Sequence, residues 1–253
     1  MGESTAPVQT TRTTIRVIEA LQELDTAGVS EIADHLDTPT STVFDHLQTL
    51  QQYEFVTSNR DGYSLGTRFL RIGGYCRRNN NLYQTAQPEL RKIARKTGEH
   101  ANLMIPEFGK GVFFAKVEGE DAFRLDTYVG KRVGLQTTAA GKAILSTLPT
   151  EEVDEFIEHH GLPEVTENTI TDEKALFEEL DVIRERGFAT DDEERIRGVR
   201  CVGAPLLDNN NEVMGAVSVS GPKSGIQDAR FEEEIPNLVL RTANVIEVNL
   251  KYQ

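Results

Sequence analysis

The sequence predicts an α+β protein of two domains, and three observations support this prediction. The 253 residues are enough for two domains of ordinary size. Up to about residue 66 the pattern is that of three short helices and a β-hairpin. Strands and helices then alternate, which predicts an antiparallel-rich sheet covered by helices. The expected boundaries are a disordered start over residues 1–11, a first domain over 12–66, a linker helix over 67–82 and a second domain over 83–253.

Composition and charge narrow the class of protein. No run of about 18 apolar residues occurs, so no membrane span is expected. The two cysteines, Cys76 and Cys201, lie far apart, which favours a reducing cytoplasm over a disulfide framework. The net charge is −14, from 27 basic and 41 acidic residues. An acid excess with few lysines is typical of proteins from a very salty cytoplasm, and an ordinary acidic protein is the alternative.

Three helices are expected in the first domain. The first covers residues 13–26, and Ala27-Gly28 ends it. Ser30 is expected to cap the second helix. Thr38 is expected to cap the third, with Pro39 at its first helical position. The inward-facing residues of the three helices, from their helical spacing, are Ile15, Ile18, Leu21, Leu24, Ile32, Ala33, Leu36, Val43, Leu47 and Leu50.

Residues 55–65 are predicted to form two short strands joined by a tight turn at Asp61-Gly62. Three short helices followed by a hairpin are typical of a winged helix-turn-helix, a module that reads DNA. Winged helices also serve as protein-interaction modules, which is the alternative.

The outer face of the third predicted helix carries residue types suited to a DNA major groove. Gln48 can pair with adenine, and Asp45 can accept a hydrogen bond from cytosine. No Lys or Arg occurs from residue 39 to residue 52, so phosphate contacts are expected from neutral donors and from Arg12, Arg16, Arg60, Arg68 and Arg71. Counterion release contributes little at high salt. The candidate DNA-contacting residues are Arg12, Thr40, Ser41, Thr42, Asp45, His46, Gln48, Thr49 and Arg60.

The remaining elements follow from periodicity and from turn residues. Helices are expected over residues 67–75, 83–97, 139–148, 150–160, 172–186 and 229–250. The polar run at residues 77–81 is expected to be the linker. Strands are expected over residues 101–106, 111–117, 123–128, 187–189, 199–207 and 212–220.

The segment around Thr138 has the features of an anion site. Thr138 can cap a helix that begins with the small residues Ala139, Ala140 and Gly141. Small side chains let a ligand approach the backbone, and free N–H groups at a helix start favour a carboxylate. Lys142, in the same helix, is expected at the surface.

These motifs, taken in order, resemble the IclR-type regulators over about residues 12–248. The matching segments are Ser41-Thr42-Val43, Leu47-Gln48-Thr49-Leu50, Tyr63-Ser64-Leu65-Gly66, Val129-Gly130-Lys131-Arg132-Val133, Thr138-Ala139-Ala140-Gly141-Lys142-Ala143-Ile144-Leu145, Gly187-Phe188-Ala189-Thr190-Asp191-Asp192-Glu193-Glu194, Gly198-Val199-Arg200-Cys201-Val202-Gly203-Ala204-Pro205 and Val217-Ser218-Val219-Ser220-Gly221-Pro222. Members often carry Arg where this chain has Asp45, and Gly where it has Glu54.

The resemblance implies a transcription regulator whose second domain is a GAF-like sensor. It implies a dimer or tetramer, a palindrome-like double-stranded DNA operator and an effector that is an organic acid or a sugar derivative. No cofactor and no metal are implied. Val199 is included in the predicted site because it shares a strand face with Cys201. The candidate effector-binding residues are Leu125, Val133, Ala139, Ala140, Gly141, Asp191, Val199, Cys201, Ser218 and Ser220.

Two other functions are weighed against this one. An enzyme using Cys201 as nucleophile needs an activating partner, and the five histidines form no Cys-His signature. A metal- or thiol-based sensor using Cys201 and Asp191 is the other alternative. Zinc requires three or four ligands, and neither a CxxC nor an HxxxH pattern occurs. The sequence therefore favours a regulator over an enzyme.

Overall fold

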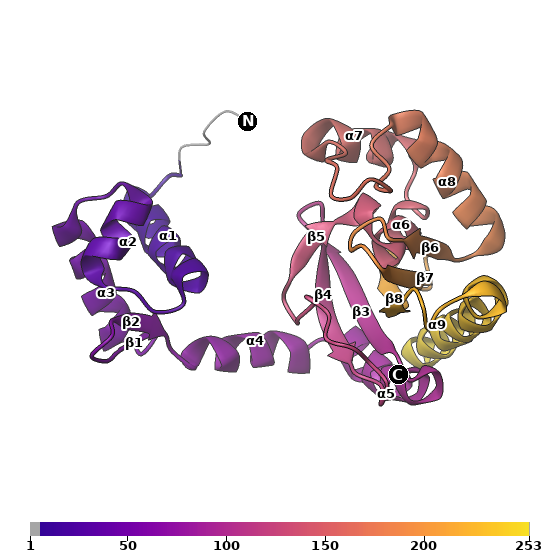
Figure 1. Ribbon diagram of the computed structural model, residues 1–253, viewed down its shortest axis with the longest axis horizontal. Helices are drawn as coiled ribbons and strands as arrows, with labels where there is room; N and C mark the ends of the chain where they lie inside the picture. The colour runs from indigo at the N-terminus through magenta and orange to yellow at the C-terminus, as the bar shows by residue number, and fades with distance from the viewer. Residues whose placement is uncertain (1–5, 253) are drawn as a thin grey trace. The chain divides into compact units, whose positions relative to one another are not determined.

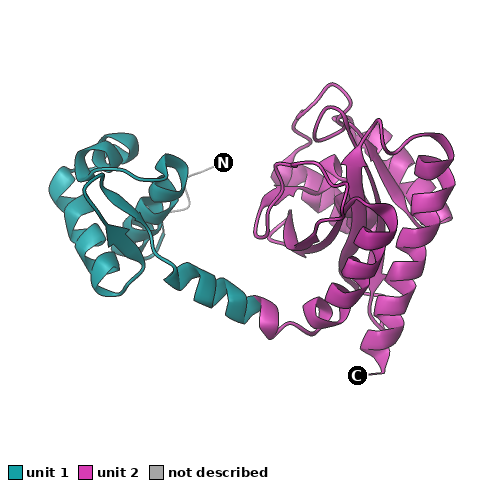
Figure 2. Cartoon of the chain, turned by 60° about the horizontal axis from the view of Figure 1, so that its bottom comes forward, with its two compact units in different colours: residues 1–76 teal, residues 77–253 magenta. Residues whose placement is uncertain are grey.

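The computed structural model describes residues 6–252. The chain divides into two compact units, residues 1–76 and residues 77–253 (Figure 2). Each unit has a hydrophobic core of its own. No helix among the described residues is long and apolar enough to cross a bilayer. Helices together with antiparallel strands confirm the predicted α+β class.

The first unit is the predicted winged helix-turn-helix. Its helices are α1 (Gln9–Leu24), α2 (Val29–Leu36) and α3 (Thr40–Gln52), followed by the antiparallel hairpin of β1 (Val56–Ser58) and β2 (Tyr63–Leu65) (Figure 1). The predicted inner residues of α2 and α3 are buried, and Leu21 of α1 packs with them. Apolar residues at helical spacing thus close a core between the three helices.

Several details of this unit differ from the sequence expectation. Helix α1 already begins at Gln9, so the expected disorder up to residue 11 is wrong for residues 9–11; residues 1–5 lie outside the described part. Ile15 is 50% exposed, because the buried stripe of α1 runs through Val17, Ala20 and Leu21. Helix α2 begins at Val29, so Ser30 is not its cap.

The start of α3 also corrects the predicted cap. Pro39 has ψ 134, an extended conformation, and precedes the helix instead of forming its first turn. The Thr38 hydroxyl donates to the carbonyl oxygen of Leu36, so it does not cap α3. Asp37, in the left-handed conformation, turns the chain between α2 and α3. Glu54, where related proteins often carry Gly, likewise has a positive φ of 61.

Helices α4 (Arg68–Arg78) and α5 (Asn81–Thr97) follow the hairpin. The sequence places the linker at residues 77–81, but α4 continues through Arg77 and Arg78. Helix α5 begins at Asn81 instead of residue 83. The Asn80 side chain caps α5 by accepting from the backbone N–H of Tyr83 at 2.9 Å. Gly98, in the left-handed conformation, ends it.

The second unit is built on a six-stranded sheet with the order β5-β4-β3-β8-β7-β6, in which every neighbouring pair is antiparallel. Its strands are β3 (His100–Glu107), β4 (Lys110–Val117), β5 (Arg132–Gly134), β6 (Ala189–Asp192), β7 (Val199–Leu207) and β8 (Val213–Pro222). The strand expected over 187–189 is therefore β6, shifted toward the C-terminus. The strand expected over 123–128 is wrong, since this segment is a loop with Leu125 and Thr127 buried.

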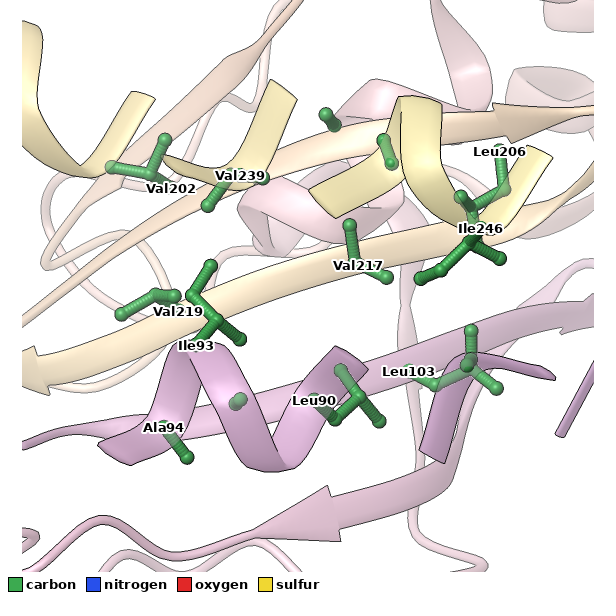
Figure 3. Close-up of a cluster of buried hydrophobic side chains, with 14 of the residues drawn as sticks. Leu90, Ile93, Ala94, Leu103, Val202, Leu206, Val217, Val219, Val239 and Ile246 are labelled. Atoms are coloured by element: carbon green, nitrogen blue, oxygen red, sulfur yellow. The ribbon is translucent and has the colours of Figure 1, made fainter. Parts of the chain in front are cut away.

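Helices cover both faces of this sheet. On one face α5 packs with the final helix α9 (Ile235–Lys251), and Leu90, Leu103, Val217 and Ile246 interlock in that core (Figure 3). On the other face lie α6 (Ala139–Leu145), α7 (Thr150–His160) and α8 (Glu173–Arg186). Helix α6 is shorter than the expected 139–148. The helix expected over 229–250 begins instead as a π-helical turn, Arg230–Glu234.

Candidate effector cavity and DNA-reading surface

A row of polar side chains crosses four strands of the sheet. Asp191 of β6 lies opposite Cys201 of β7, Cys201 lies opposite Ser220 of β8, and Ser220 lies opposite His100 of β3. Directly opposed residues point to the same side of a sheet. Ser218 lies two residues before Ser220 on β8 and so shares this face. The side chains thus converge on the face that α6 covers.

The start of α6 lies directly on β7 because Gly203 has no side chain. A Cβ at residue 203 would lie 2.8 Å from the backbone nitrogen of Ala140 and 2.9 Å from the carbonyl carbon of Ala139. Thr138 caps α6, as predicted, and its hydroxyl accepts from the Gly141 N–H at 2.9 Å. Because α6 has only seven residues, its dipole alone provides a weak anion site.

A cavity lies between this polar row and the start of α6. Its empty space, counted out to an open mouth, is about 380 Å³, and little of that space is wide enough for a water molecule. The chamber is therefore narrow, and it suits a compact ligand. The lining residues are Met104, Phe113, Leu125, Thr127, Thr138, Ala139, Ala140, Asp191, Arg195, Ile196, Val199, Cys201, Ser218 and Ser220.

Eight of the ten sequence-predicted effector residues line this cavity, and Val133 and Gly141 do not. Val133 lines a neighbouring outer groove and packs against the core beneath α6. Gly141 packs with its Cα facing the carbonyl of Leu135, where a Cβ would lie 2.1 Å from the oxygen. Its N–H is already bonded to Thr138, so it is not a free donor.

Sequence reasoning missed several lining residues. Met104 shares a strand face with Asn102 and His100, so the two-residue period of β3 was an available signal. Arg195 gave no such signal, because an arginine after the acidic run ending at Glu194 resembles an ordinary solvated loop residue. Only the fold directs Arg195 toward the chamber.

Asp191 is the buried acid of the cavity wall, with 2% of its surface exposed. Burial, followed by repulsion from Glu194, raises the pKa of its carboxyl to about 7. The backbone N–H of Glu194 donates to Asp191 Oδ1 at 2.8 Å. A substantial fraction of Asp191 is therefore protonated near neutral pH, and in that form it can donate a hydrogen bond.

The environment of Cys201 makes its thiol unreactive. Burial, together with the negative charge of Asp191, raises the pKa of Cys201 well above its ordinary value. A thiol that stays protonated is a poor nucleophile and a poor metal ligand. No group of three or more His, Cys, Asp or Glu side chains between residues 6 and 252 is arranged to hold a metal ion. The environment of Cys201 favours neither the enzyme nor the metal- or thiol-sensor alternative.

The expectation of a surface position for Lys142 is wrong. Only 1% of the residue is exposed, and its Nζ lies 2.6 Å from Glu194 Oε1 and 3.3 Å from Glu179 Oε1. Helix α6 brings Lys142 to the side that faces α8 and the loop after β6. Burial nevertheless raises the pKa of Glu194 more than Lys142 lowers it. This ion pair connects α6 with the loop that carries Asp191 and Arg195.

We expect Lys142→Met to destabilise the second unit by about 3–5 kcal/mol, because it leaves the buried Glu194 without a counter-charge. Chemical denaturation followed by circular dichroism measures the loss. The double variant Lys142→Met with Glu194→Gln serves as the control, since it removes both charges. If the double variant is as unstable as the single one, the charge pairing is not what Lys142 contributes.

Asp191→Asn is expected to change how stability depends on pH. The wild-type acid has a folded pKa of about 7, above its unfolded value, so the folded state holds the extra proton between those two values. Stability from this group is full below the unfolded pKa and is lost as pH rises through 7. Asn cannot titrate, and its oxygen can still accept from the Glu194 N–H.

Melting temperatures of both proteins between pH 5 and pH 9 test this expectation. Relative to wild type, the Asn variant should gain stability as pH rises to about 8 and then stay level. A constant difference across that range would show that Asp191 is an ordinary ionised acid.

On the DNA side, the structure exposes most of the predicted contact residues. Arg60 is exposed in the hairpin turn, and the exposed residues on α3 are Thr40, Ser41, Asp45, Gln48 and Thr49. Gln48 Nε2 donates to the Tyr63 hydroxyl at 3.3 Å, which links α3 to β2 of the wing. Phe44, which sequence reasoning missed, adds an aromatic ring that is 46% exposed.

Some predicted contact residues have structural partners in this unit. His46 is half-buried, and its Nδ1 lies 2.9 Å from the Thr14 hydroxyl of α1. Arg16 donates to the carbonyl oxygen of Leu36, and Arg68 donates to that of Tyr53. Thr42 and Arg12 are half-buried. The exposed face of α3, with Arg60, is therefore the strongest candidate surface for DNA.

Comparison with known proteins matches both units. The model of the bacterial transcriptional regulator IclR C-terminal domain matches residues 76–248, and the model of the IclR helix-turn-helix domain matches residues 13–60. The probable HTH-type transcriptional regulator ArcR of Halobacterium salinarum is 33% identical over 241 residues, which cover 94% of this chain and 92% of that protein. The HTH-type transcriptional repressor AllR of Escherichia coli strain K12 is 32% identical over 241 residues, which cover 93% and 89%.

Solved structures agree with these matches. The crystal structure of the Thermotoga maritima IclR has a TM-score of 0.81 and 31% identity, and covers 96% of this chain and 99% of that one. An IclR homologue from Microbacterium hydrocarbonoxydans complexed with 4-hydroxybenzoate shares the fold, with a TM-score of 0.83, 22% identity and coverage of 96% and 100%. The relatives are named as regulators, in agreement with the prediction of a regulator rather than an enzyme. The protein belongs to the IclR family of transcriptional regulators.

Proposed function

We propose that this regulator binds a palindrome-like operator through α3 of two copies, in the cytoplasm, and that a small metabolite in the cavity beside α6 modulates this binding. The observation that carries the effector proposal is the polar row of Asp191, Cys201 and Ser220, which meets the start of α6 at a narrow chamber. A small chamber with a few convergent polar groups is the usual form of a metabolite site.

The DNA-reading proposal rests on the exposed face of α3. Gln48 and Ser41 offer hydrogen bonds to base edges, and Phe44 offers an apolar contact of the kind that a thymine methyl accepts. Arg60 lies in the turn of the wing, where an exposed guanidinium can contact a phosphate. Asp45 disfavours nearby phosphates, so we assign it a role in base choice instead of affinity.

Two copies are proposed because α1 and α4 leave apolar surface uncovered. None of the residues of α4 is buried, and Leu70, Ile72 and Tyr75 are exposed on it. Val8 and Ile15 are exposed on and before α1, beside a surface groove. A second copy of the chain can bury these side chains, and a twofold dimer presents two reading helices to two half-sites. A tetramer through the second units remains part of the proposal.

Gln48→Ala is expected to weaken operator binding by about 1–3 kcal/mol and to relax base preference at one position of each half-site. The operator is obtained by selecting bound sequences from a random duplex library with the purified protein. Binding of the selected duplex is then measured at one fixed salt concentration. Gln22→Ala, which truncates an exposed glutamine on α1, serves as control. Equal affinity of wild type and Gln48→Ala for the selected duplex would contradict the α3 assignment.

For the effector, we expect a small acid or sugar derivative to raise the melting temperature and to change operator affinity in the same concentration range, because both follow from binding to the folded protein. The screen includes 4-hydroxybenzoate together with small aliphatic acids and sugars. Ser220→Ala should keep operator binding and lose most of the response to the hit, since it removes one polar group of the cavity wall. A full response in Ser220→Ala would place the effector elsewhere.

A further inference from the structure

One guanidinium nitrogen of the cavity wall lacks a partner. Arg195 Nη1 is buried, and no hydrogen-bond acceptor lies within reach of it. Leaving a charged donor unsatisfied and shielded from water costs free energy. Because Arg195 lines the chamber beside Cys201 and Ser220, a ligand in the chamber is in a position to supply the missing acceptor.

The rest of the Arg195 side chain is held in place. Nη2 donates to the Thr127 hydroxyl at 2.8 Å and to the carbonyl oxygen of Asp126 at 3.0 Å. The guanidinium carbon lies 5.3 Å from the centre of the Phe113 ring, within range of a cation–π contact. A donor that is already ordered loses little conformational freedom when it binds, so it contributes more to affinity.

No carboxylate of the described residues forms an ion pair with this guanidinium, although the negative charge of Asp126 is near enough to interact with it. Within residues 6–252 the side chain of Arg195 forms no ion pair, whereas Lys131, in the same region, is paired with Asp126 at 2.5 Å. The acid of the chamber wall is Asp191, and its raised pKa of about 7 leaves about half of it protonated at neutral pH and more of it below. The guanidinium therefore faces the chamber without a bonded counter-charge, in a protein whose net charge is −14.

Arg195 also stands between the chamber and the outside. An open surface groove borders the chamber and shares Leu125, Arg195, Ile196 and Val199 with it. Arg124 and Arg197 line the same groove. The groove therefore has a positive lining despite the acidic chain, which draws an anion toward the chamber.

We propose that Arg195 is the residue that makes the effector site select an anion, with Nη1 donating to a carboxylate of the ligand at the junction of groove and chamber. A hydrogen bond from a charged guanidinium nitrogen to a carboxylate oxygen is stronger than one between neutral groups. This inference rests on the proposed function, because it assigns a ligand class and a specificity residue to the same effector site.

Cys201 offers a test that does not need the natural ligand, because its thiol lies on the chamber wall with Arg195. The purified full-length protein is treated at pH 7 with 2-carboxyethyl methanethiosulfonate and, separately, with the uncharged propyl methanethiosulfonate. Mass spectrometry gives the rate of modification at each cysteine. Cys201 in the urea-unfolded protein reports the intrinsic preference between the two reagents, so the ratio at Cys201 in the folded protein is divided by the ratio at Cys201 in the unfolded one.

In wild type we expect this normalised ratio to favour the carboxylate reagent by about tenfold, because the positive charge of the cleft raises the local concentration of an anion at the thiol. Arg195→Met, which keeps the contact with Phe113 but not the charge, should reduce the ratio to about one. Arg195→Lys should retain part of the preference, because a charge remains without the planar fork. Arg91→Met removes the same charge from an exposed site on α5 and should keep the full preference.

The outcomes separate the two proposals. If both reagents modify Cys201 at equal normalised rates in wild type, or if Arg195→Met keeps the preference, anion selection by Arg195 is wrong while the chamber remains a reachable site. If neither reagent modifies Cys201 at pH 7 or, to offset the raised pKa of its thiol, at pH 9, although both modify the urea-unfolded protein, small acids do not reach the chamber. The effector site of the proposed function is then wrong as well.

Discussion

The close approach of α6 to the sheet at Gly203 is the constraint on which the candidate effector site depends. A side chain at this position would collide with the backbone of Ala139 and Ala140. Because β7 carries glycine there, the start of α6 rests on the sheet by backbone contact. The polar side chains of β6, β7 and β8 then face the capped helix start across a narrow chamber. Larger residues at Gly203 or Ala140 would fill this space, since interiors are close-packed.

The same helix is tied to the opposite wall of the chamber by charge. Lys142 of α6 pairs with Glu194, the Glu194 N–H bonds to Asp191, and Arg195 follows next in the chain. A ligand that contacts Asp191 or Arg195 therefore acts on a loop that is bonded to α6 and, through Glu179, to α8. Buried ion pairs of this kind contribute more to a single defined arrangement than to net stability. Through these bonds, a ligand in the chamber can act on both α6 and α8.

An acidic chain must bind anions by local means. DNA and the proposed effector are both negatively charged or polar, while the protein carries −14. The two proposed sites meet this requirement in different ways. On α3 the exposed groups are neutral donors, with Arg60 beside them in the wing. In the second unit one arginine is fixed without an ion-pair partner among the described residues, on the same chamber wall as an acid whose pKa burial raises to about 7. Short-range hydrogen bonds thus replace a long-range positive field.

The sequence by itself determined the winged helix-turn-helix, the α+β class and most of the chamber wall. These features follow from local patterns, which can be read from the chain without its tertiary contacts. The patterns are the apolar periodicity along α2 and α3 and the ordered motifs around Thr138, Asp191 and Ser220. Tertiary structure decided the rest. Lys142 is buried because its partners, Glu179 and Glu194, come from distant elements, and residues 123–128 form a loop because β5 takes their place at the sheet edge. The nitrogen of Arg195 likewise lacks a partner because of how three separate segments pack around it. No spacing along the chain predicts such packing.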